Sequence, residues 1–459
     1  MLELNKEIKT PIYQQIYEQF KEQIISNTLK AHERLPATRT LAQDYHISRN
    51  SVLNAYQQLE SEGFISSKIG SGFYVEELPE NNMQNEKDAV ILNSENEEKT
   101  YRYDFRYGSI EPNFYQTKAF RKALKEALNE LEEKTILNDL EPQGLFSFRK
   151  QIAEHLREVR GVDCDPKQIV ITGGHRYSLN LLAEFFDHKD YDVAIEDPGH
   201  RDVRNVFEKA SYKIHPIPLD DNGIRIDQIG KLSHTLVCLT PSHQFPMGMI
   251  LPIARRFELL KWAKENDGYI IEDDYDSELR YRERPIPALY SLDLHERVIY
   301  LGSFSKSLSP DLRVSYIVFP AGISLPLQSF HSGTSLLIQM TLSNYLKSGE
   351  YRKRINRMRN SLRKKHNMII DFFHENYQDK IKIYGIGGGS HFVLEIPNKK
   401  KDLLKIFHEE DVAVYPISDL YFDRKTGHEN MIMIGYSGIP LKQMNEYLDH
   451  LKTAIDLLM

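Results

Sequence analysis

The stretch LGSFSKSLSPDLR, residues 301–313, follows the apolar run VIY and carries an arginine seven positions after its lysine. The hydroxyl residues Ser303 and Ser305 precede Lys306, and Arg313 ends the stretch. Such a lysine suits a phosphorylated aldehyde, because its amine can form an imine while hydroxyls and a guanidinium hold a phosphate. Taken alone, a lysine in this pattern is usually a solvated surface residue. The interpretation therefore depends on what surrounds the stretch.

Strand-like and helix-like segments alternate around it, over residues 103–459. Buried strands followed by turns or helices are predicted at QIVITGG, DVAIEDPG, TLVCLTPSHQFP, GYIIEDDY and RVIYLGSFSK. Alternation of this kind predicts an α/β domain with a mainly parallel sheet, whose ligands bind at the carboxyl ends of the strands. The candidate site residues lie at such ends.

Three parts of a pyridoxal phosphate site can be assigned from these residues: an amine, an acid and a phosphate cup. Lys306 supplies the amine, Asp273 a carboxylate for the pyridine nitrogen, and Tyr275 a donor for the ring oxygen. The turn Gly173-Gly174-His175-Arg176 opens a helix, whose free N–H groups and dipole attract phosphate. The other predicted cofactor-binding residues are Gly174, His175, Arg176, His200, His243, Ser303, Ser305 and Arg313. No metal site is expected, since the 17 histidines have no ligand spacing.

The first 76 residues have a different pattern. Ile12, Ile16, Phe20 and Ile24 recur at four-residue spacing after Thr10, the expected helix cap, and Pro11. A short helix in TRTLAQDYHIS, a turn, a helix in RNSVLNAYQQLESEG and two strands around Gly70-Ser71-Gly72 follow. Three helices and a hairpin predict a winged helix-turn-helix domain over residues 1–76.

DNA binding follows from the side chains that this pattern leaves exposed. Arg49, Asn50 and Ser51 begin the second helix of the pair, the part that enters the major groove, and arginine and asparagine suit guanine and adenine edges. The predicted DNA-binding residues are Arg39, Ser48, Arg49, Asn50, Ser51, Lys68, Gly70, Ser71 and Gly72. The segment is not basic, with 8 Lys+Arg against 9 Asp+Glu through Glu76, so a small helical interaction domain is the alternative.

A resemblance supports the DNA interpretation. The segment LPATRTLAQDYHISRNSVLNAYQQLESEGFISSKIGSGFYV closely resembles the DNA-binding domain of the GntR family of bacterial regulators. Its LPxxRxLA, SRNxVxxAYxxLxxEG and GSGxYV elements occur in the family's order. The resemblance implies that double-stranded operator DNA is a partner.

Residues 77–102 separate the two patterns. They contain 7 acidic and 3 basic residues with many asparagines. Such a composition buries too little apolar surface to order a segment, so a flexible linker is predicted.

The body resembles a fold-type I aminotransferase over residues 103–459. TPSHQFPMGMILPIARRFELLKWA, IIEDDYDSELRY and SFSKSLSPDLR are especially close to the aminotransferase-like domain of the MocR/GabR regulators. The resemblance implies pyridoxal 5'-phosphate bound through a Schiff base on Lys306, with Asp273 on the pyridine nitrogen and Tyr275 on the ring oxygen. It also implies a homodimer and a small C-terminal subdomain from about Gly333.

The chain departs from that pattern at several positions. His200 stands where an aromatic residue usually stacks on the cofactor ring, and GGHRY replaces SGAQQ at the phosphate turn. Met433 stands where many aminotransferases have an arginine for a substrate carboxylate. Candidate substitutes for that arginine, by position alone, are Arg201, Arg204 and Arg424.

The function predicted from these patterns is a transcription regulator whose aminotransferase-like domain senses a small amine, an amino acid such as GABA, or the cofactor itself. The alternatives are a working aminotransferase carrying a DNA-binding head, and a DNA-binding protein with an inactive body. Met433 favours the regulator, with at most partial transamination chemistry. A charged N-terminus, short apolar runs and the isolated Cys164 and Cys238 predict a cytoplasmic protein with no membrane contact.

Overall fold

The computed structural model describes residues 2–5, 8–68, 70–78, 99–110, 114–133, 141–281, 286–325, 331–397, 402–423 and 428–459. The chain divides into two compact units, Met1–Lys99 and Thr100–Met459, each of which is described by itself. Most of the predicted linker, together with Arg424, lies outside the described residues. No described helix is both long and apolar enough to cross a membrane.

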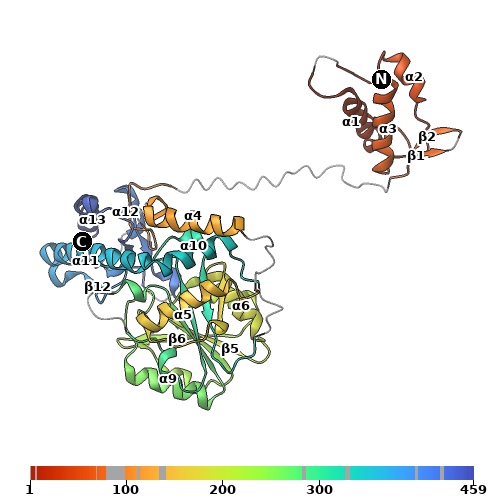
Figure 1. The fold of residues 1–459 in the computed structure, drawn as a ribbon. Coiled ribbons are helices and arrows are strands. Elements are labelled where there is room, and N and C mark those ends of the chain that lie inside the picture. The colour runs from red at the N-terminus through yellow and green to blue at the C-terminus, as the bar shows by residue number, and fades with distance from the viewer. Residues whose placement is uncertain are drawn as a thin grey trace. The chain divides into compact units, whose positions relative to one another are not determined.

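The first unit is the predicted winged helix-turn-helix. Its helices and hairpin, drawn in red and orange in Figure 1, are α1 (Ile12–Ile25), α2 (Thr38–Asp44), α3 (Arg49–Ser61), β1 (Ile65–Lys68) and β2 (Gly72–Val75). The two strands pair antiparallel, with Ile65 opposite Val75. One apolar core joins all three helices to the hairpin, and it includes Ile16, Phe20, Ile24, Leu41, Val52, Tyr56, Leu59, Ile65 and Val75.

Local signals explain where these helices begin and end. The Ser48 hydroxyl accepts a hydrogen bond from the backbone N–H of Asn50 and caps α3. Gly63 follows the end of that helix with φ +78°, a conformation that glycine adopts without strain. The expectation for the first helix was one residue early, since Pro11 rather than Thr10 occupies the N-cap position and no side chain caps α1.

An eight-stranded sheet, counted over the described residues, forms the centre of the second unit. In spatial order its strands are β4 (Ile169–Thr172), β11 (Ser315–Val318), β10 (Val298–Ser303), β9 (Tyr269–Asp274), β8 (Thr235–Leu239), β5 (Asp192–Asp197), β6 (Ile214–Asp220) and β7 (Gly223–Ile224). The five strands from β10 to β6 run parallel, whereas β11, β4 and β7 pair antiparallel. The predicted mainly parallel sheet is confirmed.

Helices cover both faces of this sheet (Figure 1). On one face, α6 (His175–Phe185) and α7 (Arg201–Lys209) pack on apolar residues of β4, β5, β8, β9 and β10. On the other face, α9 (Ile253–Glu265) packs on Val237, Ile270 and Val298, and α5 (Phe146–Arg160) packs on Ile169 and Ile171. Because helices cover both faces of the sheet, polar side chains of a site can lie together only at the ends of the strands.

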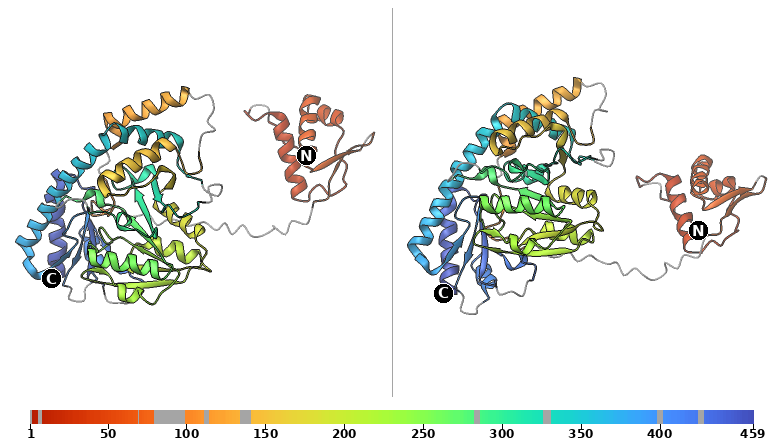
Figure 2. Two further views of the ribbon diagram at one scale, coloured as in Figure 1. Left: turned by 60° about the horizontal axis from the view of Figure 1, so that its bottom comes forward. Right: turned by 90° about the horizontal axis from the view of Figure 1, so that it is seen from below.

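A C-terminal layer completes the unit. It is reached through α10 (Leu336–Lys347), which lies beside α4 (Lys118–Glu133), and the long α11 (Glu350–Tyr377), seen from two further directions in Figure 2. The layer consists of β12 (Lys382–Tyr384), β13 (His391–Glu395), β15 (Tyr415–Pro416) and β16 (Met431–Gly435), with α12 (Leu403–Glu409) and α13 (Met444–Leu458). Residues from near the start of the unit join it, because β3 (Tyr103–Asp104) pairs with β14 (Val412–Ala413).

Candidate functional site

Lys306 and Asp273 lie at the carboxyl ends of two adjacent parallel strands. Asp273 is opposite Leu301 in the β9–β10 register, and Lys306 follows β10 by three residues. Burial lowers the pKa of Lys306 to about 8, although the charges of Asp276 and Asp273 oppose that shift. A larger fraction of this amine than of an exposed lysine is therefore neutral and nucleophilic near neutral pH.

The Lys306 amine is covered by a segment that the sequence analysis did not assign to the site. Its Nζ lies 3.8 Å from the centre of the Tyr107 ring. A Cβ on Gly108 would lie 2.3 Å from the same Nζ, so a larger residue there would displace the amine from this position. Tyr107 and Gly108 are about 200 residues away from Lys306 in the sequence, and no local motif connects them.

Asp273 forms an ion pair with a histidine of the predicted phosphate turn. His175 Nε2 lies 2.8 Å from Asp273 Oδ2. Burial works to raise the pKa of Asp273, but the charge and hydrogen bond of His175, helped by the Lys306 amine, outweigh it and hold that pKa below its ordinary value. Burial likewise opposes the charge on His175, yet Asp273 keeps the pKa of His175 raised. The site therefore holds a carboxylate that stays ionised although it is buried.

His200 lies beside this pair in the neutral form. Its ring centre is 5.3 Å from that of His175. Burial, followed by the charge of His175, lowers the pKa of His200 to about 4. Its Nδ1 accepts the backbone N–H of Asp202, so the ring caps α7 and is fixed in orientation.

The start of α6 and the Arg313 side chain form one corner of the site. Gly174 is the N-cap residue, with φ +105°, and a Cβ there would lie 2.9 Å from Nη2 of Arg313. The free N–H groups at the helix start and this guanidinium converge on one corner, as a phosphate requires. Ser303 lies opposite Ser315, which in turn lies opposite Thr172 at the end of β4, and the Ser305 N–H donates to the Ser303 hydroxyl at 3.1 Å. The Arg176 side chain is exposed.

Tyr275, which follows β9, and His243, which follows β8, contact each other. The Tyr275 hydroxyl lies 2.9 Å from Nδ1 of His243, whose side chain is buried. Burial raises the pKa of Tyr275 well above its ordinary value, and the charge of Asp276 adds to that rise. The phenol is therefore neutral and keeps a proton to donate.

The arginines predicted to bind a substrate carboxylate differ in their contacts and exposure. Arg204 is already engaged, with its Nε 2.8 Å from Glu208 Oε1 and its Nη1 donating to the Phe422 carbonyl. Arg201 is exposed at the first position of α7 and lines a cavity of about 110 Å³ with Arg204, His200 and Asp273. Arg424 lies outside the described residues. Met433, in β16, is buried among Phe245, Val393, Ile417 and Met431.

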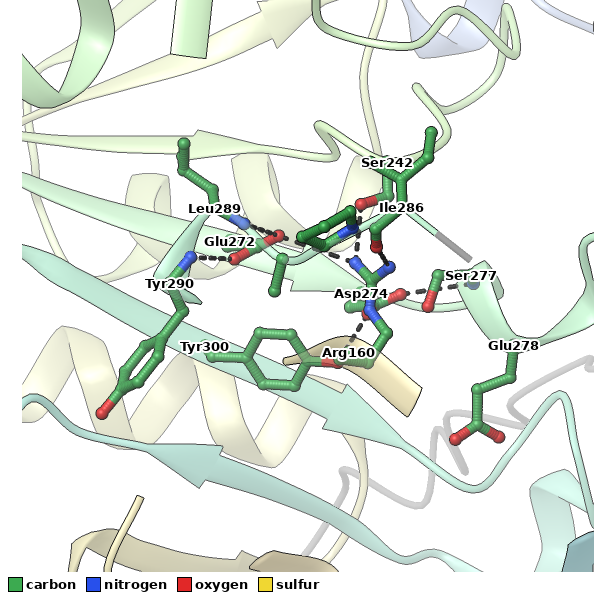
Figure 3. Close-up of polar contacts among 12 residues, drawn as sticks. Arg160, Ser242, Glu272, Asp274, Ser277, Glu278, Ile286, Leu289, Tyr290 and Tyr300 are labelled. Atoms are coloured by element: carbon green, nitrogen blue, oxygen red, sulfur yellow. Dashed lines mark hydrogen bonds and ion pairs between the residues drawn. The ribbon is translucent and has the colours of Figure 1, made fainter. Parts of the chain in front are cut away.

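The opposite face of β9 carries a buried charge network (Figure 3). Glu272 and Asp274 point away from the Asp273 side, because successive residues of a strand face opposite ways. Arg160 Nε lies 2.7 Å from Asp274 Oδ2, and the Tyr300 hydroxyl donates to the same carboxylate oxygen at 2.5 Å. Glu272 accepts the backbone N–H groups of Leu289 and Tyr290. These contacts fix the strand that presents Asp273.

In the first unit, the predicted DNA-binding residues lie on two exposed parts of the domain, the helices α2 and α3 and the hairpin. Arg39 is on α2, and Arg49 and Asn50 begin α3 with exposed side chains. Lys68 is exposed on the hairpin, with Nζ 4.9 Å from the centre of the Tyr74 ring. The Ser71 and Tyr74 hydroxyls form a 2.6 Å hydrogen bond that braces the hairpin tip. Arg34, which the sequence analysis did not include, packs against Gly72 and adds a cation next to the hairpin.

Comparisons with known proteins assign both units. Residues 12–75 match the family model of bacterial regulatory proteins of the gntR family, and residues 108–451 match that of aminotransferase class I and II. An uncharacterized HTH-type transcriptional regulator of Bacillus subtilis, YdeL, is 36% identical, with 98% of each chain covered. The probable rhizopine catabolism regulatory protein MocR of Rhizobium meliloti is 30% identical over 99% of this chain and 96% of its own.

A solved structure extends the likeness to the fold. A kynurenine aminotransferase of Pyrococcus horikoshii, crystallised in complex with PMP, is 25% identical and has a TM-score of 0.69. The match covers 78% of this chain and 92% of the enzyme. The predicted fold, a winged helix-turn-helix joined to a fold-type I aminotransferase domain, is confirmed by these matches.

The charge network behind β9 leads to a stability prediction. Arg160→Leu leaves Asp274 and Glu272 buried without their cation and should lower the free energy of unfolding of the second unit by about 3–5 kcal/mol. Trp262, the single tryptophan, reports unfolding of that unit by its fluorescence in a denaturant titration. Arg157→Leu, on the same helix but in an exposed pair with Asp163, should cost less than about 1 kcal/mol. Equal losses for the two variants would show that the network does not stabilise the unit.

Proposed function

The chain belongs to the HTH-type transcription regulators of the MocR kind, in which a GntR-type domain is joined to an aminotransferase class I and II domain, and we propose that it uses that second domain as a sensor. The proposed ligand of the domain is pyridoxal 5'-phosphate, attached through Lys306. The proposed effector is a small amine, an amino acid such as GABA, or the cofactor itself.

Several contacts support the cofactor proposal. The corner formed by Gly174 and Arg313 suits a dianionic phosphate, and no hydrogen bond of Arg313 to another described side chain competes for it. Asp273, held ionised by His175, suits a protonated pyridine nitrogen. Lys306 offers a nucleophilic amine whose pKa responds to the charge of Asp273. When bound, the cofactor would supply an aldehyde that exchanges between amines; this chain's residues orient it and exclude water.

The observation that carries the sensing proposal is the position of Tyr107 and Gly108 over the Lys306 amine. The segment from Tyr103 to Ser109 is fixed to the C-terminal layer: Gly435 N–H donates to the Phe105 carbonyl at 2.8 Å, and the Ser437 hydroxyl donates to the Ser109 carbonyl. Towards the N-terminus the same segment continues, along the sequence, into the linker and the DNA-binding domain.

Coupling between the two functions then has a physical route. A bound cofactor would supply an aldehyde that can pass from Lys306 to an arriving amine, and the freed Lys306 side chain would then change what packs under Tyr107 and Gly108. A ligand can shift an equilibrium only if it binds the two states unequally, and coupling energies are typically about 1–3 kcal/mol. The proposed output is a repositioning of the DNA-binding domains in a homodimer, rather than sustained transamination.

The first prediction from this proposal is spectroscopic. Protein reconstituted with pyridoxal phosphate should be yellow, and Lys306→Ala should lose the absorption band of the covalent adduct. Lys353→Ala, an exposed lysine paired with Glu350, should keep it. A colourless wild-type protein in excess cofactor would contradict the assignment of Lys306.

The second prediction concerns the DNA-binding surface. Arg49→Ala and Asn50→Ala should each weaken binding to an operator selected from random DNA by about 1–3 kcal/mol and relax base preference. Lys68→Ala should weaken binding to all sequences alike, because a phosphate contact carries no sequence information. Lys21→Ala, whose amine pairs with Glu62 on the helical side, serves as control in a fluorescence anisotropy titration. Sequence selectivity at Lys68 combined with a neutral Arg49 would contradict the placement of the recognition helix.

The third prediction tests the coupling. Several Gly/Ser residues inserted within residues 77–102 should leave cofactor binding intact and reduce the effect of an amine effector on operator affinity. The same residues added after Met459 should change neither. Joint measurement of the cofactor spectrum and operator affinity decides this, and a full effector response in the lengthened protein would rule out the proposed route.

A further inference from the structure

We propose that His243 and Asp276 act together as a positioning pair: they orient the Tyr275 hydroxyl so that its proton points to the ring oxygen of the cofactor. Through that hydrogen bond the pair sets the acidity of the nitrogen at Lys306. This inference rests on the proposed function, and it assigns a role to Asp276, a residue outside the predicted site.

The contact between His243 and Asp276 is short and bidentate, and both side chains are buried. His243 Nδ1 lies 3.0 Å from Oδ2 and 3.1 Å from Oδ1 of Asp276. The exposed fractions of the two side chains are 3% and 2%. The Tyr275 hydroxyl lies 2.9 Å from the same Nδ1. One ring nitrogen therefore meets a carboxylate and a phenol together.

The carboxylate decides which way the protons point. A carboxylate offers only acceptors, so Nδ1 must carry a proton and donate it to Asp276. A protonated Nδ1 cannot accept from Tyr275, whose oxygen therefore faces an N–H and receives part of that hydrogen bond. The phenol's own proton is left for another acceptor, and the cofactor's ring oxygen is the acceptor that the proposed function provides.

Two glycines hold the imidazole in this orientation. A Cβ on Gly389 would lie 2.3 Å from Cε1 of His243, and a Cβ on Gly248 would lie 3.1 Å from its Nε2. Both glycines have positive φ, +86° and +75°. Nε2 is buried and makes no hydrogen bond to any described residue. The ring thus fits a narrow slot between the loop after β8 and the C-terminal layer, with its polar contacts all on the Nδ1 side.

The positioning role and a direct electrostatic role of Asp276 predict opposite changes in the pKa of the nitrogen at Lys306 when Asp276 is replaced. Losing the phenol's hydrogen bond to the ring oxygen removes a stabilisation of the deprotonated adduct, so the pKa of the nitrogen at Lys306 rises. Losing the negative charge of Asp276 alone would lower that pKa, because Asp276 and Asp273 are the charged groups that favour a proton on Lys306. The direction of change therefore separates the two roles.

The test follows the absorption band of full-length protein reconstituted with pyridoxal phosphate as a function of pH. Tyr275→Phe should raise the midpoint by about one unit. Asp276→Asn should also raise the midpoint. The double variant Tyr275→Phe/Asp276→Asn should raise it no further than Tyr275→Phe alone. His243→Asn, whose amide N–H lies close to Nδ1, should stay near wild type, whereas His243→Leu should behave like Asp276→Asn.

Asp192→Asn is the matched control, since Asp192 pairs with His215 at the opposite end of β5 and should leave the midpoint unchanged. A midpoint that falls in Asp276→Asn overturns the positioning role. So does an Asp276→Asn shift that is as large in the Tyr275→Phe variant as in the wild-type protein. Absence of any band in the wild-type protein would instead overturn the proposed function, and this inference with it.

Discussion

Strand β9 presents three consecutive acidic side chains, and the neutralisation of their charges determines what the site can do. Asp273 faces the site and is held ionised by His175, while Glu272 and Asp274 face the other way and are balanced by Arg160 and backbone N–H groups. Burying a carboxylate costs several kcal/mol unless partners replace the lost water. The two faces of the strand are thus mutually dependent: the rear network fixes the strand, and the fixed strand places Asp273.

Much of the fold was predictable from local patterns. The helix-turn-helix elements follow from four-residue apolar spacing, the Ser48 cap and Gly63, and the mainly parallel sheet follows from the order of strand-like and helix-like segments. Residues such as Lys306 and Asp273 stand at strand ends that the sequence already marks. The start of α1 was less well predicted, because Thr10 and Pro11 are both acceptable before a helix.

The parts that were not predictable are contacts between distant segments. Nothing around Tyr107 or Gly108 indicates that they cover Lys306, since that contact depends on how β3 pairs with β14 in the C-terminal layer. His175 was expected to contribute to a phosphate turn, and its ion pair with Asp273 appears only once α6 is placed beside β9. Met433 lies in an apolar cluster, so β16 presents an apolar side chain at the position where a substrate-binding arginine was sought.

The central claim is that one amine, Lys306, connects ligand chemistry with DNA binding. The most direct measurement is a titration of the full-length protein with pyridoxal phosphate and then with a panel of amines and amino acids, in which absorbance and operator affinity are recorded on the same sample. The account predicts that some amine changes both signals together at the same concentration, without sustained production of a keto acid. Operator affinity that is unaffected while the spectrum changes, or steady turnover of an amino acid, would contradict it.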